Sequence, residues 1–190
     1  MTTSIMIVGV GGQGTLLAGR ILGNAAIARG YDVKMSEVHG MSQRGGSVVT
    51  CVRYGEKVYS PVIAEGGADV ILAFEQLEAY RYLNYLKKGG GMLMNTRAID
   101  PMPVITGVAE YPGDIPGKIK NAGARVVAAD AFAAAVEAGS AKAVNVVLIG
   151  LLAAETEIPK DVWMNAVEQT VPPKFLEINK KAFDLGYHLR

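Results

Sequence analysis

The segment IMIVGVGGQG at residues 5–14 decides how the rest of the chain is interpreted. Residues 5–10 form a short apolar run closed by glycines, which is typical of a strand buried on both faces of a parallel sheet. The helical spacing of Leu17, Ile21 and Ala25, with Gly30 as a stop, predicts a helix over residues 15–29. The chain therefore begins as a Rossmann-like strand, loop and helix.

The loop between this strand and this helix carries the pattern G-x-G-x-x-G. Glycines let phosphate oxygens approach backbone N–H groups, and the N-terminus of the helix adds partial positive charge. The candidate anion or phosphate loop comprises Gly9, Gly11, Gly12, Gln13 and Gly14. The same glycines would also serve a tight turn with close packing of the helix, so a purely structural role stays open.

Alternation of strands and helices continues along the chain and predicts the fold class. Extended segments are expected over residues 31–36, 70–74, 92–95 and 125–130, a β-hairpin over 47–54 and 57–60, a helix over 76–86, and a break at 89–91. Residues 101–116 contain four prolines and predict a surface connection. Helices are expected from residue 131, over 142–155 and 160–170, and from Pro172–Pro173 to Leu185, with Gly186 as the stop. We expect a single α/β domain over residues 1–190. It would be a three-layer α/β/α sandwich with a mostly parallel, mixed sheet and a helical C-terminus.

Composition excludes several classes of protein. The chain has 19 Lys+Arg against 18 Asp+Glu, which gives no sign of nucleic-acid binding. Its longest apolar stretch, residues 143–154, is far below the roughly 20 residues that cross a bilayer, and no basic segment precedes the first strand. We therefore expect a cytoplasmic protein that binds neither nucleic acid nor membrane.

Cysteine usage bears on redox chemistry. Cys51 is the only cysteine, whereas a [4Fe–4S] cluster normally takes four thiolates, and with two histidines available we assign no metal. Gly113–Asp114 begins like the G-D-G of a thiamine diphosphate motif, but Ile115 stands in the third position. The chain therefore carries no redox centre of its own, and any redox function must be exercised inside a larger complex.

Residues 37–46, EVHGMSQRGG, are expected to form a loop at the edge of the sheet. Besides Glu37, four polar side chains stand among its glycines: His39, Ser42, Gln43 and Arg44. They are candidate contributors to an active site or a partner interface, and Arg44 is the best candidate because a guanidinium binds a carboxylate or a phosphate bidentately. A charged surface loop held by local hydrogen bonds is the alternative.

Five segments carry a family resemblance: VGVGGQG at 8–14, SEVHGMSQRGGSVV at 36–49, YSP at 59–61, LAFEQLEAYRYL at 72–83 and NVVLIGLL at 145–152. Together with KFLEINKKAFDLGY at 174–187, they resemble the beta subunit of indolepyruvate:ferredoxin oxidoreductase. More broadly, they resemble the gamma subunit or domain of the 2-oxoacid:ferredoxin oxidoreductases. The HGMSQRGGSV segment favours the indolepyruvate branch over the pyruvate and 2-oxoglutarate branches.

The resemblance implies oxidative decarboxylation of an aryl 2-oxoacid with coenzyme A, giving an arylacetyl-CoA, CO₂ and two reduced ferredoxins. It further implies that thiamine diphosphate, Mg²⁺ and [4Fe–4S] clusters belong to a large partner subunit, in a dimer of heterodimers that meets ferredoxin. This chain, inactive alone, would complete the active-site wall or the approach of coenzyme A. A free-standing NAD- or FMN-binding Rossmann-like enzyme and a purely structural subunit remain alternatives.

Overall fold

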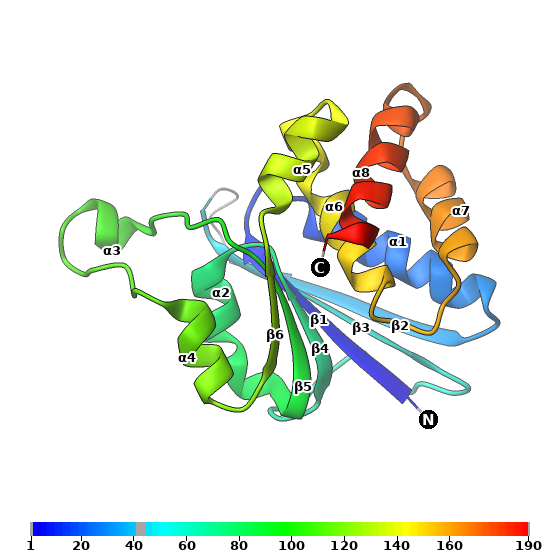
Figure 1. The fold of residues 1–190 in the computed structure, drawn as a ribbon. Helices are drawn as coiled ribbons and strands as arrows, with labels where there is room; N and C mark the ends of the chain where they lie inside the picture. Colours follow the sequence, from blue (N-terminus) through cyan, green and yellow to red (C-terminus); the bar gives the residue numbers. More distant parts are fainter. Residues whose placement is uncertain (1, 41–44, 190) are drawn as a thin grey trace.

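The computed structural model describes residues 2–40 and 45–189, which form a six-stranded sheet between two helical layers (Figure 1). The strands are β1 (Thr2–Val10), β2 (Asp32–His39), β3 (Ser47–Gly55), β4 (Ala68–Ala73), β5 (Leu86–Asn95) and β6 (Arg125–Ala129). Their order in the sheet is β2-β3-β1-β4-β5-β6. Strands β1, β4, β5 and β6 pair in parallel, and β3 is antiparallel to both of its neighbours.

The helices divide between the two faces of the sheet. The α-helices are α1 (Thr15–Ala28), α2 (Gln76–Arg81), α3 (Met102–Ile105), α4 (Ile115–Asn121), α5 (Ala131–Ala138), α6 (Val144–Ala153), α7 (Lys160–Thr170) and α8 (Leu176–His188). Short 3₁₀ turns cover Leu83–Tyr85, Ala141–Ala143 and Pro173–Phe175. Helices α1, α5, α6, α7 and α8 cover one face, and α2 and α4 cover the other (Figure 1). The predicted α/β class, with a mixed sheet between helical layers, is confirmed.

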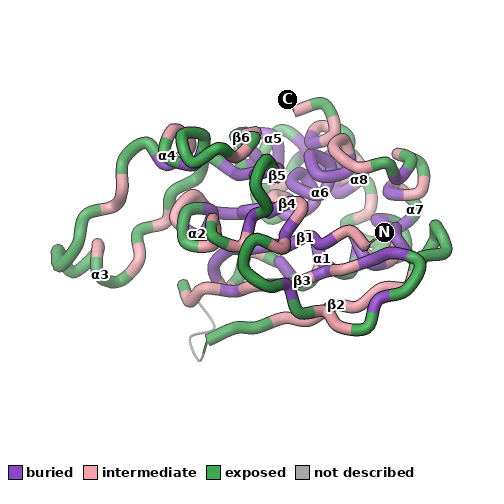
Figure 2. Tube along the Cα trace, turned by 90° about the horizontal axis from the view of Figure 1, so that it is seen from below, coloured by how far each residue is buried: buried purple, intermediate pink, exposed green. Residues whose placement is uncertain are grey.

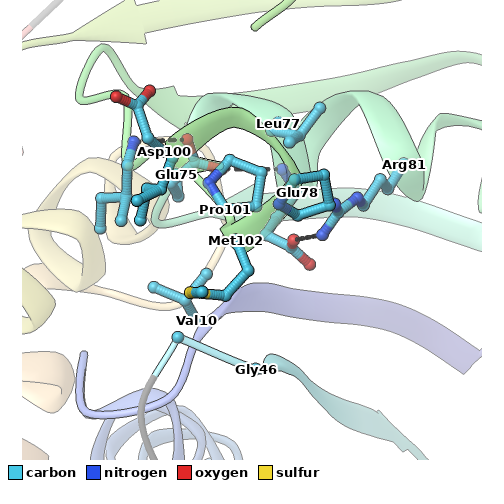
Figure 3. Close-up of a pocket in the computed structure, with 13 residues that line it drawn as sticks. Val10, Gly46, Glu75, Leu77, Glu78, Arg81, Asp100, Pro101 and Met102 are labelled. Atoms are coloured by element: carbon cyan, nitrogen blue, oxygen red, sulfur yellow. Dashed lines mark hydrogen bonds and ion pairs between the residues drawn. The ribbon is translucent and has the colours of Figure 1, made fainter. Parts of the chain in front are cut away.

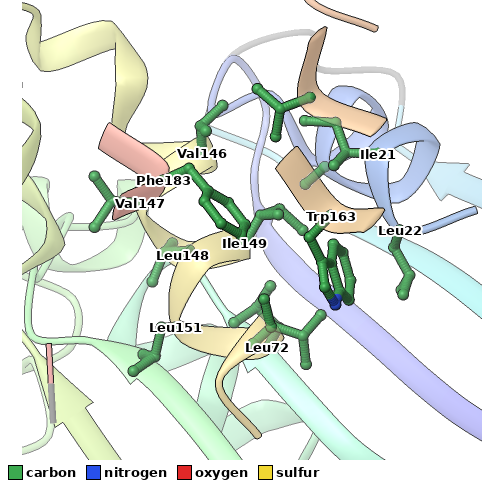
Figure 4. Close-up of a cluster of buried hydrophobic side chains, with 14 of the residues drawn as sticks. Ile21, Leu22, Leu72, Val146, Val147, Leu148, Ile149, Leu151, Trp163 and Phe183 are labelled. Atoms are coloured by element: carbon green, nitrogen blue, oxygen red, sulfur yellow. The ribbon is translucent and has the colours of Figure 1, made fainter. Parts of the chain in front are cut away.

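The sheet separates two hydrophobic cores because side chains alternate along a strand. Ile5 and Ile7 of β1 pack in the larger core, beneath α1 and α6, whereas Met6 and Val8 face the smaller core beneath α2 and α4. Helix α6 is almost entirely buried, from Asn145 to Ala153. Figure 4 shows Leu148, Ile149 and Leu151 of α6 with Trp163 of α7 and Phe183 of α8 in this larger core.

Helices α6 and α8 approach each other closely through two glycines. A Cβ on Gly186 would lie 1.9 Å from the carbonyl oxygen of Val147, and one on Gly150 would lie 2.2 Å from that of Phe183. The prediction that Gly186 ends the last helix is therefore wrong, because this glycine lies inside α8 and lets the two backbones meet.

Two further sequence predictions are wrong around β3. Glu37, Val38 and His39, expected in a loop, continue β2 and pair with Thr50, Val49 and Val48 of β3. Residues 57–60, expected to pair with β3 in a hairpin, are not in a strand, because both sides of β3 are occupied by β1 and β2.

The expected break at residues 89–91 is also wrong, since these glycines lie within β5, near an irregular pairing with β4. Strand β2 forms one edge of the sheet and contains no buried residue, as Figure 2 shows along its length. None of the helices in the described ranges is long and apolar enough to cross a membrane.

Candidate functional site at the carboxyl end of the sheet

The glycine loop turns the chain from β1 into α1 with backbone angles that favour glycine. Gly12 and Gly14 have φ values of 96° and 81°, in the left-handed region where a Cβ is unfavourable. A Cβ on Gly14 would also lie 2.6 Å from the Nδ2 atom of Asn145. The backbone N–H of Gly11 donates to the carbonyl of Gly46 at 2.8 Å, which joins the glycine loop to the start of β3.

The side chain of Gln13 folds back and closes the loop. Its Oε1 accepts from the N–H of Val10 at 2.8 Å, and its Nε2 donates to the carbonyl of Phe74 at 3.2 Å. Both hydrogen bonds use groups at the ends of adjacent parallel strands, β1 and β4. Gln13 therefore holds the shape of the loop, and its side-chain amide is already engaged within the chain.

Two buried asparagines, which the sequence analysis did not assign to this loop, support it from the neighbouring elements. The Asn145 Nδ2 atom of α6 donates to the carbonyl of Gly14 at 3.4 Å. Asn95, at the end of β5, donates to the carbonyl of Phe74 at 3.3 Å and accepts from the N–H of Ala131 at 3.2 Å. A sequence signal existed, because Asn95 directly follows an apolar strand and Asn145 interrupts the most apolar helix.

The N-terminus of α1 faces the loop without a side-chain cap. Gly14 is the N-cap residue, its position supplies no side-chain hydrogen bond, and the first turn contains no acidic residue. The first N–H groups of a helix lack partners within the helix, and the helix dipole adds partial positive charge there. This end of α1 therefore favours an anion.

A basic recess of about 330 Å³ opens on one side of the loop. It is lined by Gly12, Gln13, Gly14, Asn95, Arg97, Ala141, Lys142, Val144 and Asn145. Arg97 and Lys142 are its two cationic side chains, and none of these lining residues is acidic. The Arg97 guanidinium also lies 4.7 Å from the ring centroid of Phe132, which orients it.

A second recess, of about 310 Å³, opens on the other side of the loop beside Glu37 and His39. The Glu37 Oε2 atom accepts from Thr50 Oγ1 at 2.8 Å and from Thr15 Oγ1 at 3.4 Å. His39 is exposed, and its Nδ1 lies 3.2 Å from the carbonyl oxygen of Gly40. The structure thus brings His39 beside the glycine loop, whereas Ser42, Gln43 and Arg44 lie outside the described residues.

A third cleft, of about 360 Å³, lies between the start of β3 and the connection that follows β5. Figure 3 shows Met102 and Pro101 of that connection together with Val10, Gly46 and Glu75. Glu75 and Glu78 line this cleft, and each is only 1% exposed. A sequence signal existed, because Glu75 directly follows the apolar residues 70–74 and Glu78 lies three residues further on.

Both buried glutamates have partners. Glu78 accepts from Ser47 Oγ and Arg81 Nη1, each at 2.5 Å. Glu75 accepts from the N–H groups of Glu78 and Ile99, each at 3.0 Å, and from the hydroxyl of Tyr111. Burial, together with the neighbouring Glu75 carboxylate, raises the pKa of Tyr111 above its ordinary value, so this hydroxyl stays a hydrogen-bond donor.

The donor set does not suit the cofactors of thiamine and iron–sulfur enzymes. Among the described residues, no three His, Cys, Asp or Glu side chains are grouped so as to hold a metal ion. Asp114 caps α4 by accepting from the N–H of Gly117 at 3.1 Å, and Asn145 is engaged with Gly14. Asp114, which superficially suggested a thiamine diphosphate motif, therefore has a structural task.

All three openings lie where β1, β4 and β5 end. In α/β sheets, ligands bind beyond the carboxyl ends of the strands, at the point where the connections from two adjacent strands pass to opposite faces of the sheet. Fold and site together define an α/β domain with a Rossmann-like glycine loop, an uncapped helix end and an adjoining basic recess. More narrowly, the chain belongs to the pyruvate ferredoxin/flavodoxin oxidoreductase family, because the sequence pattern of that family matches residues 4–189. The family resemblance predicted from the sequence is confirmed.

Individual relatives agree with this assignment. The indolepyruvate oxidoreductase subunit IorB of Thermococcus kodakarensis is 48% identical over 188 residues, which cover 96% of this chain and 93% of that protein. The gamma subunit of a keto/oxoacid ferredoxin oxidoreductase from Geobacter sulfurreducens is structurally similar, with a TM-score of 0.74, 28% identity, and coverage of 98% of this chain and 96% of that one. The ketoisovalerate oxidoreductase subunit VorA of Methanothermobacter marburgensis is 28% identical over 187 residues, which span 96% of this chain but 35% of that longer protein.

Proposed function

We propose that this chain is the small, cluster-free subunit of an indolepyruvate:ferredoxin oxidoreductase in the cytoplasm. The observation that carries the proposal is its 48% identity to an indolepyruvate oxidoreductase subunit IorB across nearly the whole of both chains. The reaction would be oxidative decarboxylation of an aryl pyruvate with coenzyme A, giving an arylacetyl-CoA and CO₂ while two ferredoxins are reduced.

The redox cofactors of the complex would belong to a large partner subunit. One cysteine cannot supply the four thiolates of a [4Fe–4S] cluster, and the G-D-G pattern of a thiamine diphosphate site is absent. When bound to that partner, thiamine diphosphate with Mg²⁺ would supply the carbanion chemistry and the clusters would remove the electrons. The two subunits would form a dimer of heterodimers that meets ferredoxin.

The contribution of this chain would be to hold the phosphates of coenzyme A at the glycine loop. Gly12 leaves the backbone open to phosphate oxygens, the end of α1 favours negative charge, and Arg97 and Lys142 stand in the same recess. This arrangement would orient the thiol end of coenzyme A toward the partner. The residues that line the recess include no histidine and no carboxylate, so we assign it binding and orientation rather than proton transfer.

Steady-state kinetics of the assembled complex test this role. Arg97→Ala and Lys142→Ala should each raise the KM for coenzyme A by about ten- to a hundredfold, since one charge-assisted hydrogen bond is worth roughly 1.5–3 kcal/mol, with kcat little changed. Lys120→Ala, an exposed lysine on α4 at the opposite face, is the matched control and should leave both constants unchanged. Unchanged constants in both recess variants would rule out a role of this recess in binding coenzyme A.

Arg44 remains a separate proposal that rests on the sequence. Arg44→Lys should leave the complex intact and raise the KM for either the oxoacid or coenzyme A, because lysine cannot make the bidentate contact. A substrate panel of indolepyruvate, pyruvate and 2-oxoglutarate distinguishes the branches of the family. Tight binding of NAD or FMN to the chain alone would instead support a free-standing nucleotide-binding protein.

A further inference from the structure

A connection of 13 residues, 98–110, projects from the body of the protein between β5 and α4, and we call it the arm (Figure 1). Its central stretch, residues 101–109, contains no charged residue. Met102, Ile105 and Val108 of this stretch are 66%, 65% and 82% exposed. An uncharged, apolar projection of this kind is unusual on a surface that meets only water.

The arm has a defined shape of its own. The N–H groups of Val104 and Ile105 donate to the carbonyl of Pro101 at 2.9 and 3.1 Å, and those of Val108 and Ala109 donate to the carbonyl of Pro103 at 2.9 and 3.0 Å. These bonds wind the tip into the short helix α3 and a turn. Its apolar side chains are therefore presented on an organised backbone, which lowers the entropy lost on binding.

A single buried carboxylate holds both ends of the arm. Glu75 accepts from the N–H of Ile99 where the arm leaves the body and from the hydroxyl of Tyr111 where it returns. The same carboxylate caps α2 at the N–H of Glu78. Burying a carboxylate is costly unless it is well hydrogen-bonded. The three hydrogen bonds that Glu75 accepts meet this condition, and two of them fix the direction of the arm.

The arm rises beside the proposed coenzyme A recess. Arg97 of that recess lies directly before the arm, and its carbonyl accepts from the N–H of Gln76 at 3.2 Å. On its other side, the arm shares the third cleft with Gly45 and Gly46 at the start of β3. The arm thus stands at the carboxyl end of the sheet. A partner that holds the thiamine centre would have to approach this end to reach bound coenzyme A.

We propose that the arm is the element by which this chain docks on the large subunit, with Met102, Ile105 and Val108 inserted into an apolar recess of that subunit and Glu75 as the residue that positions the arm. The inference rests on the proposed function, because the partner is the cofactor-binding subunit which that function requires. The arm borders the proposed coenzyme A recess, and this continuity favours the large subunit over a second copy of this chain. In the longer VorA, the part similar to this chain is joined to other sequence, which is consistent with a partner that differs from this chain.

The test measures the affinity of this chain for a tagged large subunit expressed from the same source. Ile105→Asp places a charge at the centre of the docking surface and should raise the Kd at least tenfold. Val136→Asp on α5 is the matched control, since that side chain is 53% exposed on another element, and it should change the Kd less than twofold. Both substituted side chains are exposed, so both variants should melt within about 2 °C of the wild type.

A second variant addresses the positioning role. Glu75→Gln keeps the shape of the side chain and leaves the apolar tip unchanged, but it removes the charge that holds both ends of the arm. It should weaken association severalfold, and Tyr111→Phe, which removes one of the same hydrogen bonds, should act in the same direction. Glu157→Gln, an exposed glutamate outside the arm, controls for the loss of charge and should leave association unchanged.

Each outcome bears on a different claim. If the wild-type chain fails to bind the large subunit, the proposed function itself is wrong. If the wild type binds and Ile105→Asp binds equally well, or if the control weakens binding as much, the docking role of the arm is overturned while the proposed function stands. If light scattering shows that Ile105→Asp dissociates a homodimer and leaves the large-subunit affinity unchanged, the arm joins two copies of this chain instead.

Discussion

The contact between α6 and α8 makes a quantitative prediction for Gly186→Ala. The added Cβ would lie 1.9 Å from the carbonyl oxygen of Val147, whereas ordinary contacts begin at 3.4 Å, so the helices must separate locally by about 1.5 Å. Overpacking of this kind costs roughly 1–3 kcal/mol, and the clash with rigid backbone places it at the upper end. The better helix propensity of alanine returns about 1 kcal/mol.

We therefore expect Gly186→Ala to lower the free energy of unfolding by about 2 kcal/mol, or the Tm by about 4–8 °C for a chain of this size. Gly23→Ala is the matched control, because a Cβ there would lie 3.8 Å from Val33 in ordinary contact. It should be neutral or stabilising by up to about 1 kcal/mol. Thermal unfolding followed by circular dichroism measures both. Equal stability of the two variants would refute the close approach of the two helices.

Further predictions concern the loop and the tyrosines. Gly14→Ala should destabilise the full chain by about 2–3 kcal/mol in urea unfolding, because its left-handed backbone and the clash with a buried amide both oppose a Cβ; Gly12→Ala, with free space around it, should cost only about 1–2 kcal/mol. Burial raises the pKa of Tyr54 above its ordinary value, and burial beside Glu75 does the same for Tyr111. The stability contributed by their neutral forms is complete below the unfolded tyrosine pKa of about 10 and is lost as the pH rises toward the folded values. In an alkaline titration at 295 nm, Tyr111→Phe should remove late-titrating absorbance; loss of an early-titrating tyrosine would contradict the assigned environment.

Local patterns were sufficient wherever a single segment carried the information. The strand and helix around residues 5–29 were predicted because apolar spacing and glycines are read within one element, and β1 and α1 match them closely. The family was also recognisable from short segments spread along the chain. The glycine loop was placed correctly between its two elements. Local spacing could not predict its bond to Asn145 of α6, or that Gln13 of the loop and Asn95 of β5 share the carbonyl of Phe74.

Residues 57–60 show where a local pattern fails. Their composition and Gly55–Glu56 favour a hairpin with β3, but strand pairing depends on which partners compete for the same edge. β3 is enclosed by β1 and β2, and this leaves it no edge for residues 57–60. The prediction that Gly186 ends the last helix is wrong for a related reason. A glycine that ends a helix and a glycine that lets a neighbouring backbone approach cannot be told apart from the sequence alone.

Composition, periodicity and local motifs were therefore enough to predict the class of fold, the position of the glycine loop and the family. They also show that the chain has too few cysteines to supply the four thiolates of a cluster. In contrast, the shared recess of Arg97 and Lys142 and the bonds by which Glu75 joins both ends of the arm to α2 depend on how distant segments pack together. Arg97 and Lys142 are 45 positions apart, and Glu75 and Tyr111 are 36 apart. Such contacts arise from the order of strands in the sheet and the packing of helices upon it, which no local pattern records.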